Sequence, residues 1–256
     1  MTARPPFDRA GEGPSVILVH AGIADRRMWR PYLPWLAAQG RQAIAPDLPG
    51  FGDHVPTPDP TAPWDYLRDV LDELDVGRAV VVGCSFGGAV ALRLAVTAPE
   101  RVQSLAVISS PAPGLEPSPR LQAAWAAEED ALERGDIDAA VDAVVRAWLA
   151  PDAPAELRDL VATMQRRAFE LDPEGTMPQP TDPLQDRPEL LRAIDVPALI
   201  AVGEHDMPDF RWSARQLAQE LPHASHHVIP GAGHLAALET PEAFRQLLGE
   251  FLAGSD

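Results

Sequence analysis

Residues 83–87, Gly-Cys-Ser-Phe-Gly, decide the fold, because they place a serine between two glycines at the junction of a strand and a helix. The preceding residues 78–82 are typical of a short buried strand, and residues 88–95 have helix composition. A serine on so tight a turn is lifted out of the sheet, and glycine is needed where a Cβ would collide with the adjacent strand or helix. This context predicts that Ser85 is a nucleophile, and the alternative is that Ser85 only caps the helix.

Strand-like and helix-like segments alternate on both sides of this junction. The expected strands are residues 16–20, 43–47, 78–82 and 104–108, and the expected helices are residues 29–38, 63–74 and 88–95. Strands joined through helices need crossover connections, which bring the strands into the sheet in parallel. The sequence therefore predicts an α/β fold with a mostly parallel sheet and helices on both faces.

The alternation stops at residues 110–114 and is replaced by helical composition as far as Pro188. Three helices are expected there, over residues 121–133, 137–149 and 155–170. The sheet then resumes, with expected strands at residues 196–202 and 226–229 and helices at residues 212–220 and 241–252, the last capped by Thr240. We therefore expect a core of residues 1–112 and 189–256, with residues 113–188 inserted as a helical lid over the carboxyl ends of the strands.

Composition and charge exclude several function classes. The 256 residues carry a formal net charge of −17, and the resulting field repels nucleic acid and anionic membranes, so neither is expected as a partner. The chain has no lysine, which excludes Schiff-base chemistry. Cys84 is the only cysteine, which excludes an intrachain disulfide and a cysteine-based zinc site. We expect neither a metal nor an organic cofactor.

No apolar run reaches membrane-spanning length, and residues 1–6 lack the apolar core of a signal peptide. The sequence therefore predicts a cytoplasmic protein that acts on a small molecule. It leaves open whether the protein is a monomer or a dimer.

A nucleophilic serine needs a base, and His234 is the strongest candidate among the seven histidines. It ends the glycine-rich run Gly-Ala-Gly-His at residues 231–234, between the last expected strand and the last expected helix. Such a loop lies at the carboxyl edge of the sheet, which is the edge that presents Ser85. We therefore predict that His234 takes the proton of Ser85.

The base in turn needs an acid that orients it. Residues 203–206, Gly-Glu-His-Asp, follow the expected strand that ends at Val202, and Asp206 can reach the same edge of the sheet. Glu204 and Asp209 are nearby alternatives. Asp206 is the predicted acid.

Negative charge that develops on an attacked carbonyl oxygen needs N–H donors aimed at it in advance. One donor is expected from the backbone of Phe86, at the start of the helix after the nucleophile. The second is expected from the loop after the first long strand, where Gly22 allows a close approach of the backbone and Ile23 is the alternative in register. His20, in the same loop, is expected to brace it rather than to take part in chemistry.

The sequence resembles the α/β-hydrolase family, specifically its small, lidded, esterase-like bacterial members. The motifs that carry the resemblance extend from Val16 to the C-terminus: His20-Ala21-Gly22 with Trp29, Asp47-Leu48-Pro49-Gly50-Phe51-Gly52, residues 83–88, residues 203–206 and residues 231–234. The chain order Ser85, Asp206, His234 is that of the family. The resemblance also implies shortened N-terminal strands, because few residues precede Val16.

The resemblance implies a serine hydrolase that cleaves an ester, thioester or lactone through an acyl-enzyme intermediate. Carbon–carbon bond hydrolysis and cofactor-free perhydrolysis use the same three residues and remain alternatives, as does a ligand-binding member with slow turnover. Trp125 and Trp148 in the expected lid, together with Ile23, are candidate substrate contacts for an apolar substrate. At helical spacing such aromatic residues more often pack within the lid itself.

Overall fold

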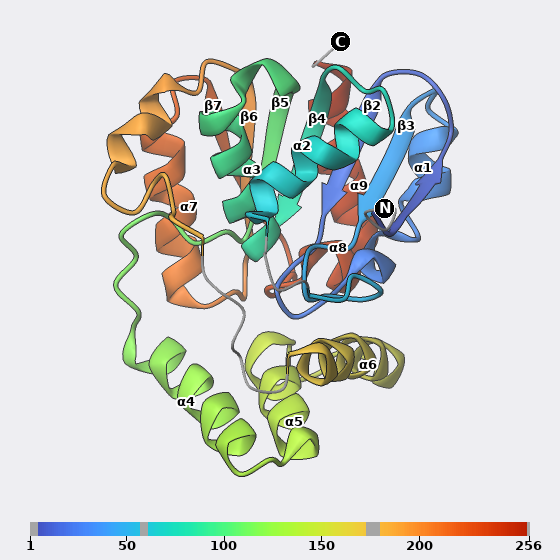
Figure 1. The fold of residues 1–256 in the computed structure, drawn as a ribbon. Helices are drawn as coiled ribbons and strands as arrows, with labels where there is room; N and C mark the ends of the chain where they lie inside the picture. Colours follow the sequence, from blue (N-terminus) through green and yellow to red (C-terminus); the bar gives the residue numbers. More distant parts are fainter. Residues whose placement is uncertain (1–4, 57–60, 173–179, 255–256) are drawn as a thin grey trace.

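The computed structural model describes residues 5–56, 61–172 and 180–254, and its centre is a seven-stranded sheet (Figure 1). The order across the sheet is β1-β3-β2-β4-β5-β6-β7, in which only β1 runs antiparallel, to β3. The strands are β1 (Phe7–Ala10), β2 (Ser15–Val19), β3 (Gln42–Pro46), β4 (Ala79–Cys84), β5 (Val102–Ile108), β6 (Ala198–Gly203) and β7 (Ala224–Ile229). The mostly parallel sheet is confirmed. Among the described residues a single four-residue strand precedes β2, as the shortened N-terminus predicts.

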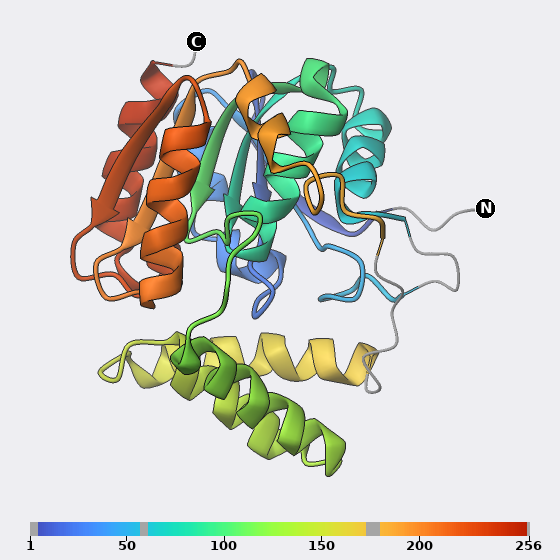
Figure 2. The ribbon, with the colours of Figure 1, turned by 90° about the vertical axis from the view of Figure 1, so that its left-hand side faces the viewer.

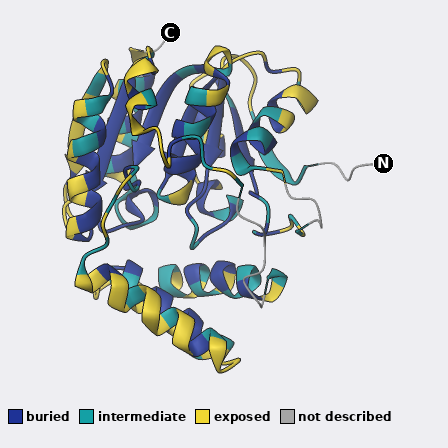
Figure 3. Cartoon of the chain, turned by 60° about the vertical axis from the view of Figure 1, so that its left-hand side comes forward, coloured by how far each residue is buried: buried dark blue, intermediate teal, exposed yellow. Residues whose placement is uncertain are grey.

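Helices cover both faces of the sheet (Figure 1). On one face α1 (Leu33–Ala37) lies near α9 (Pro241–Ala253), and Phe244 of α9 contacts the rings of Trp29 and Tyr32 at 6.0 and 5.3 Å between centroids. The other face carries α2 (Pro63–Glu73), α3 (Phe86–Thr97), α7 (Pro208–Glu220) and two 3-10 helices, η2 (Pro99–Arg101) and η3 (Pro188–Ala193). The central strands β2 and β4 are therefore buried along their whole length (Figure 3).

The structure differs from two local expectations. Residues 29–38 are not one helix: a 3-10 helix, η1 (Arg26–Trp29), is followed by the short α1, because Pro31 and Pro34 lack the amide hydrogens that a continuous helix needs. Thr240 does not cap α9 with its side chain. Its hydroxyl donates instead to the carbonyl of Ala236, in an additional short helix, α8 (Ala236–Glu239).

Between β5 and β6 the chain leaves the sheet and forms three helices, α4 (Pro119–Glu133), α5 (Ile137–Trp148) and α6 (Ala155–Leu171). We call these three helices the helical block. Ser118 and Asp136 cap α4 and α5 by accepting from the N–H groups of Leu121 and Ala139. The two flanking strands pair directly, so the chain rejoins the sheet beside the strand it left. Figures 1 and 2 place the block beyond the edge of the sheet where β4 ends.

Candidate active site

Ser85 occupies the turn between β4 and α3 in a strained conformation, with a φ of 52° and a ψ of −116°. A positive φ in a residue other than glycine costs on the order of 1–3 kcal/mol, so the surrounding structure must hold it. An added Cβ at Gly83 would overlap the backbone of Gly87, and one at Gly87 would overlap the carbonyl of Val19. The two glycines are therefore required for this close approach of strand and helix, as the sequence predicts.

Ser85, His234 and Asp206 form one continuous chain of hydrogen bonds. The Nε2 atom of His234 lies 2.8 Å from the Oγ atom of Ser85, and Nδ1 lies 3.0 and 3.1 Å from the two carboxylate oxygens of Asp206. A carboxylate only accepts, so Nδ1 carries the ring hydrogen and Nε2 is left free to accept from the hydroxyl of Ser85. Asp206 is itself held by the N–H of Met207, at 2.7 Å. The structure thus brings together the three residues predicted from sequence.

The two rival acids lie elsewhere. Glu204 is exposed, and its carboxylate accepts from the N–H of Gly231 at 2.9 Å. Asp209 is buried in the first turn of α7 and accepts from the N–H and the hydroxyl of Ser118, at 2.7 and 2.8 Å. Burial acts to raise the pKa of Asp209, but the two bonds from Ser118, the backbone N–H of Asp209 itself and the charge of Arg120 together outweigh it and leave this pKa below its usual value. Asp209 therefore anchors the start of the helical block to the core.

Glu239 braces the loop that carries His234, a role the sequence reasoning missed. Its carboxylate accepts from the N–H of Gly233 at 3.1 Å and from the N–H of Leu235 at 2.9 Å, the residues on either side of His234. Burial raises the pKa of Glu239, opposed by these N–H groups and that of Ala150 in the turn after α5. An acidic residue directly after the apolar run at residues 235–238 was the available signal in the sequence.

Gly22 and Phe86, the predicted oxyanion donors, are neighbours in space. A Cβ added at Gly22 would lie 3.4 Å from the Cβ of Phe86, and both residues line the cavity that contains Ser85. Neither backbone N–H has an acceptor within the part of the chain that the structure describes. Phe86 is the first residue of α3, where unpaired N–H groups and the helix dipole favour negative charge. Ile23, the alternative in register, also lines the cavity.

His20 braces the Gly22 loop, as its position in the sequence suggests. Its Nε2 atom accepts from the N–H of Leu48 at 2.9 Å, so Nδ1 carries the hydrogen and donates to the carbonyl of Ala21 at 2.8 Å. The ring is fully buried, and burial lowers its pKa. The loop is therefore attached to the segment after β3 by a neutral imidazole.

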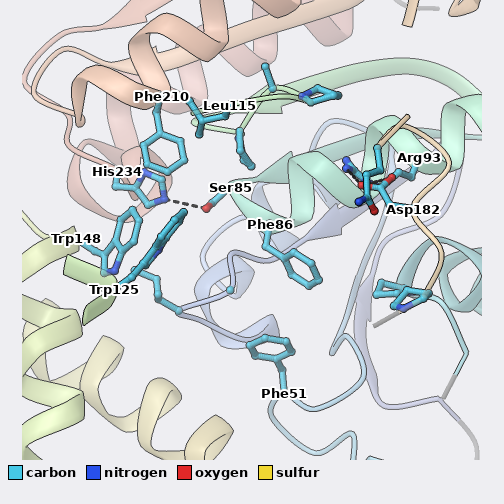
Figure 4. A pocket seen from close by; sticks show the side chains of 18 of the residues that line it. Phe51, Ser85, Phe86, Arg93, Leu115, Trp125, Trp148, Asp182, Phe210 and His234 are labelled. Carbon is cyan, nitrogen blue, oxygen red and sulfur yellow. Dashed lines mark hydrogen bonds and ion pairs between the residues drawn. The ribbon is translucent and has the colours of Figure 1, made fainter. Parts of the chain in front are cut away.

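A cavity of about 950 Å³ opens beside Ser85 and is bounded by the core and the helical block (Figure 4). Trp148 of α5 and Phe210 of α7 pack against the ring of His234, with centroids 4.6 and 4.4 Å away. Trp125 of α4 lines the same cavity and is 46% exposed. The predicted contacts Ile23, Trp125 and Trp148 therefore all reach the cavity wall. Phe210 does too, but nothing in its local sequence distinguishes it from a core residue.

The wall beyond Phe86 is polar (Figure 4). Arg93 of α3 forms a bidentate ion pair with Asp182, from the segment that re-enters the core after the helical block. Glu128 of α4 also lines the cavity, and burial raises its pKa. Within the described ranges no three His, Cys, Asp or Glu side chains are arranged to hold a metal ion. No described helix combines the length and apolar character that crossing a bilayer requires.

Comparison with known proteins identifies the family of the chain. The family model described as "Alpha/beta hydrolase family" matches residues 16–247. The chain belongs to this family. A 2-hydroxymuconate semialdehyde hydrolase of Pseudomonas sp. (strain CF600) is 31% identical to this α/β hydrolase over 96% of the chain and 89% of that protein. A carboxylesterase of Bacillus subtilis (strain 168), YbfK, is 28% identical over 95% of the chain and 81% of that protein.

Solved structures are similar along the whole fold. A thermophilic esterase from Thermogutta terrifontis superposes with a TM-score of 0.80 at 26% identity, covering 98% of this chain and 93% of that one. These three relatives of this α/β hydrolase are hydrolases, namely two esterases and a hydrolase of a hydroxymuconate semialdehyde.

Proposed function

We propose that this α/β hydrolase cleaves an ester, thioester or lactone of a small, largely apolar substrate through an acyl-enzyme intermediate. Ser85 is the nucleophile, His234 the general base and Asp206 the orienting acid. The observation that carries the proposal is the hydrogen-bonded chain from the strained Ser85 through His234 to the buried Asp206, at the wall of the cavity. A protein that only binds a ligand has no need of these three groups in register.

The reaction follows from this arrangement. The Oγ atom of Ser85 attacks the substrate carbonyl carbon while Nε2 of His234 accepts the hydroxyl proton. Asp206 stabilises the imidazolium that forms. The N–H groups of Gly22 and Phe86 bind the oxygen that becomes negative. Nε2 then protonates the leaving alcohol or thiol, and water activated by the same nitrogen hydrolyses the acyl-enzyme and regenerates Ser85.

The helical block, within residues 113–188, serves as the lid of this site. Support comes from Trp125 of α4 and Trp148 of α5, which line the same cavity as Ser85. The packing of Trp148 and Phe210 on His234 removes water from one side of the imidazole, which strengthens its bonds to Ser85 and Asp206. The aromatic wall suits an apolar acyl or alcohol group.

Carbon–carbon bond hydrolysis is the second candidate, favoured by the relative that acts on 2-hydroxymuconate semialdehyde. That compound contains no ester or amide, so its hydrolysis breaks a carbon–carbon bond, and it carries a carboxylate. The same Ser85, His234 and Asp206 would serve such a reaction. The two candidates therefore differ in the substrate that the cavity must bind, which is a largely apolar ester, thioester or lactone in the first case and a compound with a carboxylate in the second.

Turnover of p-nitrophenyl butyrate, with and without Ser85→Ala, tests the proposal. We expect measurable release of p-nitrophenol by the wild type and a loss of about 10⁴-fold or more in the variant, together with loss of covalent labelling by a fluorophosphonate. Labelling of Ser85→Ala at the wild-type rate would show that Ser85 is not the nucleophile. A wild type that binds the ester without a burst or turnover would instead be a ligand-binding member of the family.

A further inference from the structure

The charged groups around the cavity are few. Among the described residues that line it, the ionisable side chains other than His234 are Arg93, Glu128 and Asp182. The described part of the cavity wall therefore has one cation, Arg93, against two carboxylates.

Arg93 is not available to a ligand carboxylate. Its Nε atom donates to Asp182 Oδ1 at 2.9 Å, Nη2 donates to Oδ2, and Nη1 donates to the carbonyl of Ala89 at 2.9 Å. Burial acts to raise the pKa of Asp182, but Arg93 and the N–H of Leu184 outweigh it and lower this pKa. Asp182 thus stays ionised, and the side-on pair neutralises the guanidinium.

Glu128 is the remaining charged group among the described lining residues, and no described residue is its counter-ion. Its side chain is partly buried in α4 at the cavity wall, and it has no hydrogen-bond or ion-pair partner within the ranges that the structure describes. Trp125, one turn earlier on the same helix, lines the same cavity. A second carboxylate brought into this space meets an unpaired negative charge in a partly desolvated setting, where repulsion is stronger than in water.

We infer that this cavity selects uncharged esters or lactones and rejects substrates that carry a carboxylate, with Glu128 and the Arg93–Asp182 pair as the residues that determine this specificity. The inference rests on the proposed function and narrows its substrate class. A neutral substrate can donate a hydroxyl or amide hydrogen to Glu128, whereas a carboxylate finds no free cation among the described lining residues. Anionic substrates of the carbon–carbon type are disfavoured for the same reason.

A matched pair of esters tests the inference. Methyl phenyl adipate and phenyl hydrogen adipate differ only in whether the distal end is a methyl ester or a carboxylate. Phenol release reports cleavage of the phenyl ester bond in each compound. For the wild type we expect kcat/KM to be about tenfold or more higher for the neutral ester, which corresponds to one unfavourable charge pair at reduced dielectric.

Three variants assign the effect. Glu128→Gln should lower the neutral-to-anionic ratio by about threefold or more, because the repelling charge is removed. Asp182→Asn should lower the neutral-to-anionic ratio by more than Glu128→Gln does, because Arg93 becomes free to pair with the substrate carboxylate. The control is Glu129→Gln, which removes the same charge from the exposed next position of α4 and should leave the ratio unchanged.

Equal kcat/KM for the two esters in the wild type would overturn the inference. A large ratio that neither Glu128→Gln nor Asp182→Asn alters would overturn the assignment to these residues. Binding of both esters to Ser85→Ala, measured by calorimetry, keeps the two proposals separate. If the wild type turns over neither ester, turnover of p-nitrophenyl butyrate decides the proposed function. Binding then decides charge selection, because tighter binding of the neutral ester supports it and equal binding refutes it.

Discussion

Replacing Asp206 by asparagine isolates the electrostatic part of the proposed mechanism. Oδ1 of Asp206 accepts from the N–H of Met207 at 2.7 Å and from Nδ1 of His234 at 3.0 Å. The carbonyl oxygen of an asparagine can occupy this position, because the Met207 N–H requires an acceptor there. The Nδ1 hydrogen, and with it the orientation of the ring toward Ser85, can then be kept. Asp206→Asn removes the negative charge beside the ring and puts an amide nitrogen in place of Oδ2, which lies 3.1 Å from Nδ1.

The size of the effect follows from the distance. With charge centres about 4 Å apart and an effective dielectric constant of about 20, the interaction between the carboxylate and an imidazolium is about 4 kcal/mol. The imidazolium exists only once the proton has left Ser85, so this energy stabilises the transition state and not bound substrate. We expect kcat to fall about 10³-fold while KM changes little.

The assay compares Asp206→Asn with Glu204→Gln in steady-state hydrolysis of p-nitrophenyl butyrate, with circular dichroism to confirm folding. Glu204 lies two residues away and is exposed, and its carboxylate contacts the N–H of Gly231 and the ring of His205 rather than His234, so its variant should retain kcat within about threefold. If Glu204→Gln were the crippling change and Asp206→Asn nearly silent, the assignment of the acid would be wrong, although the role of Ser85 would stand.

Two further predictions concern the groups that hold the site in place. Glu239→Gln turns one acceptor into a donor that faces an N–H beside His234, so we expect a loss of about 2 kcal/mol in stability and at least a tenfold fall in kcat; calorimetric unfolding and kcat both at the wild-type values would contradict this. The pKa of Asp209 is lower in the folded protein, so its bonds to Ser118 stabilise at neutral pH and are lost as the pH falls through that lowered pKa. In urea unfolding, Asp209→Asn should therefore be less stable than the wild type at pH 7, and the difference should shrink toward pH 2; a constant difference would exclude this linkage.

The sequence predicted those parts of the site that depend on local geometry. The turn at Ser85 was identifiable because its requirements, glycine at two positions with a strand before and a helix after, all lie within about twenty residues. The helical block was predictable from the helical spacing of its apolar residues and from the glycine and proline residues between its helices. The expectation of one helix over residues 29–38 was wrong for an equally local reason, because Pro31 and Pro34 lack the amide hydrogens that a continuous helix needs.

The sequence by itself determined the fold class and indicated Ser85 and His234, because the hydrophobic period, the turn residues and the loop position can be read from neighbouring residues. It favoured Asp206 as the acid but left Glu204 and Asp209 as alternatives. Only the tertiary structure decided which acidic side chain meets His234 and which carboxylate braces its loop. It alone showed that Asp182 pairs with Arg93, 89 positions earlier in the chain, and that no described residue is a counter-ion of Glu128. Such contacts join segments that are distant in sequence. Packing of the helical block on the sheet brings these segments together, and no local sequence pattern encodes that packing.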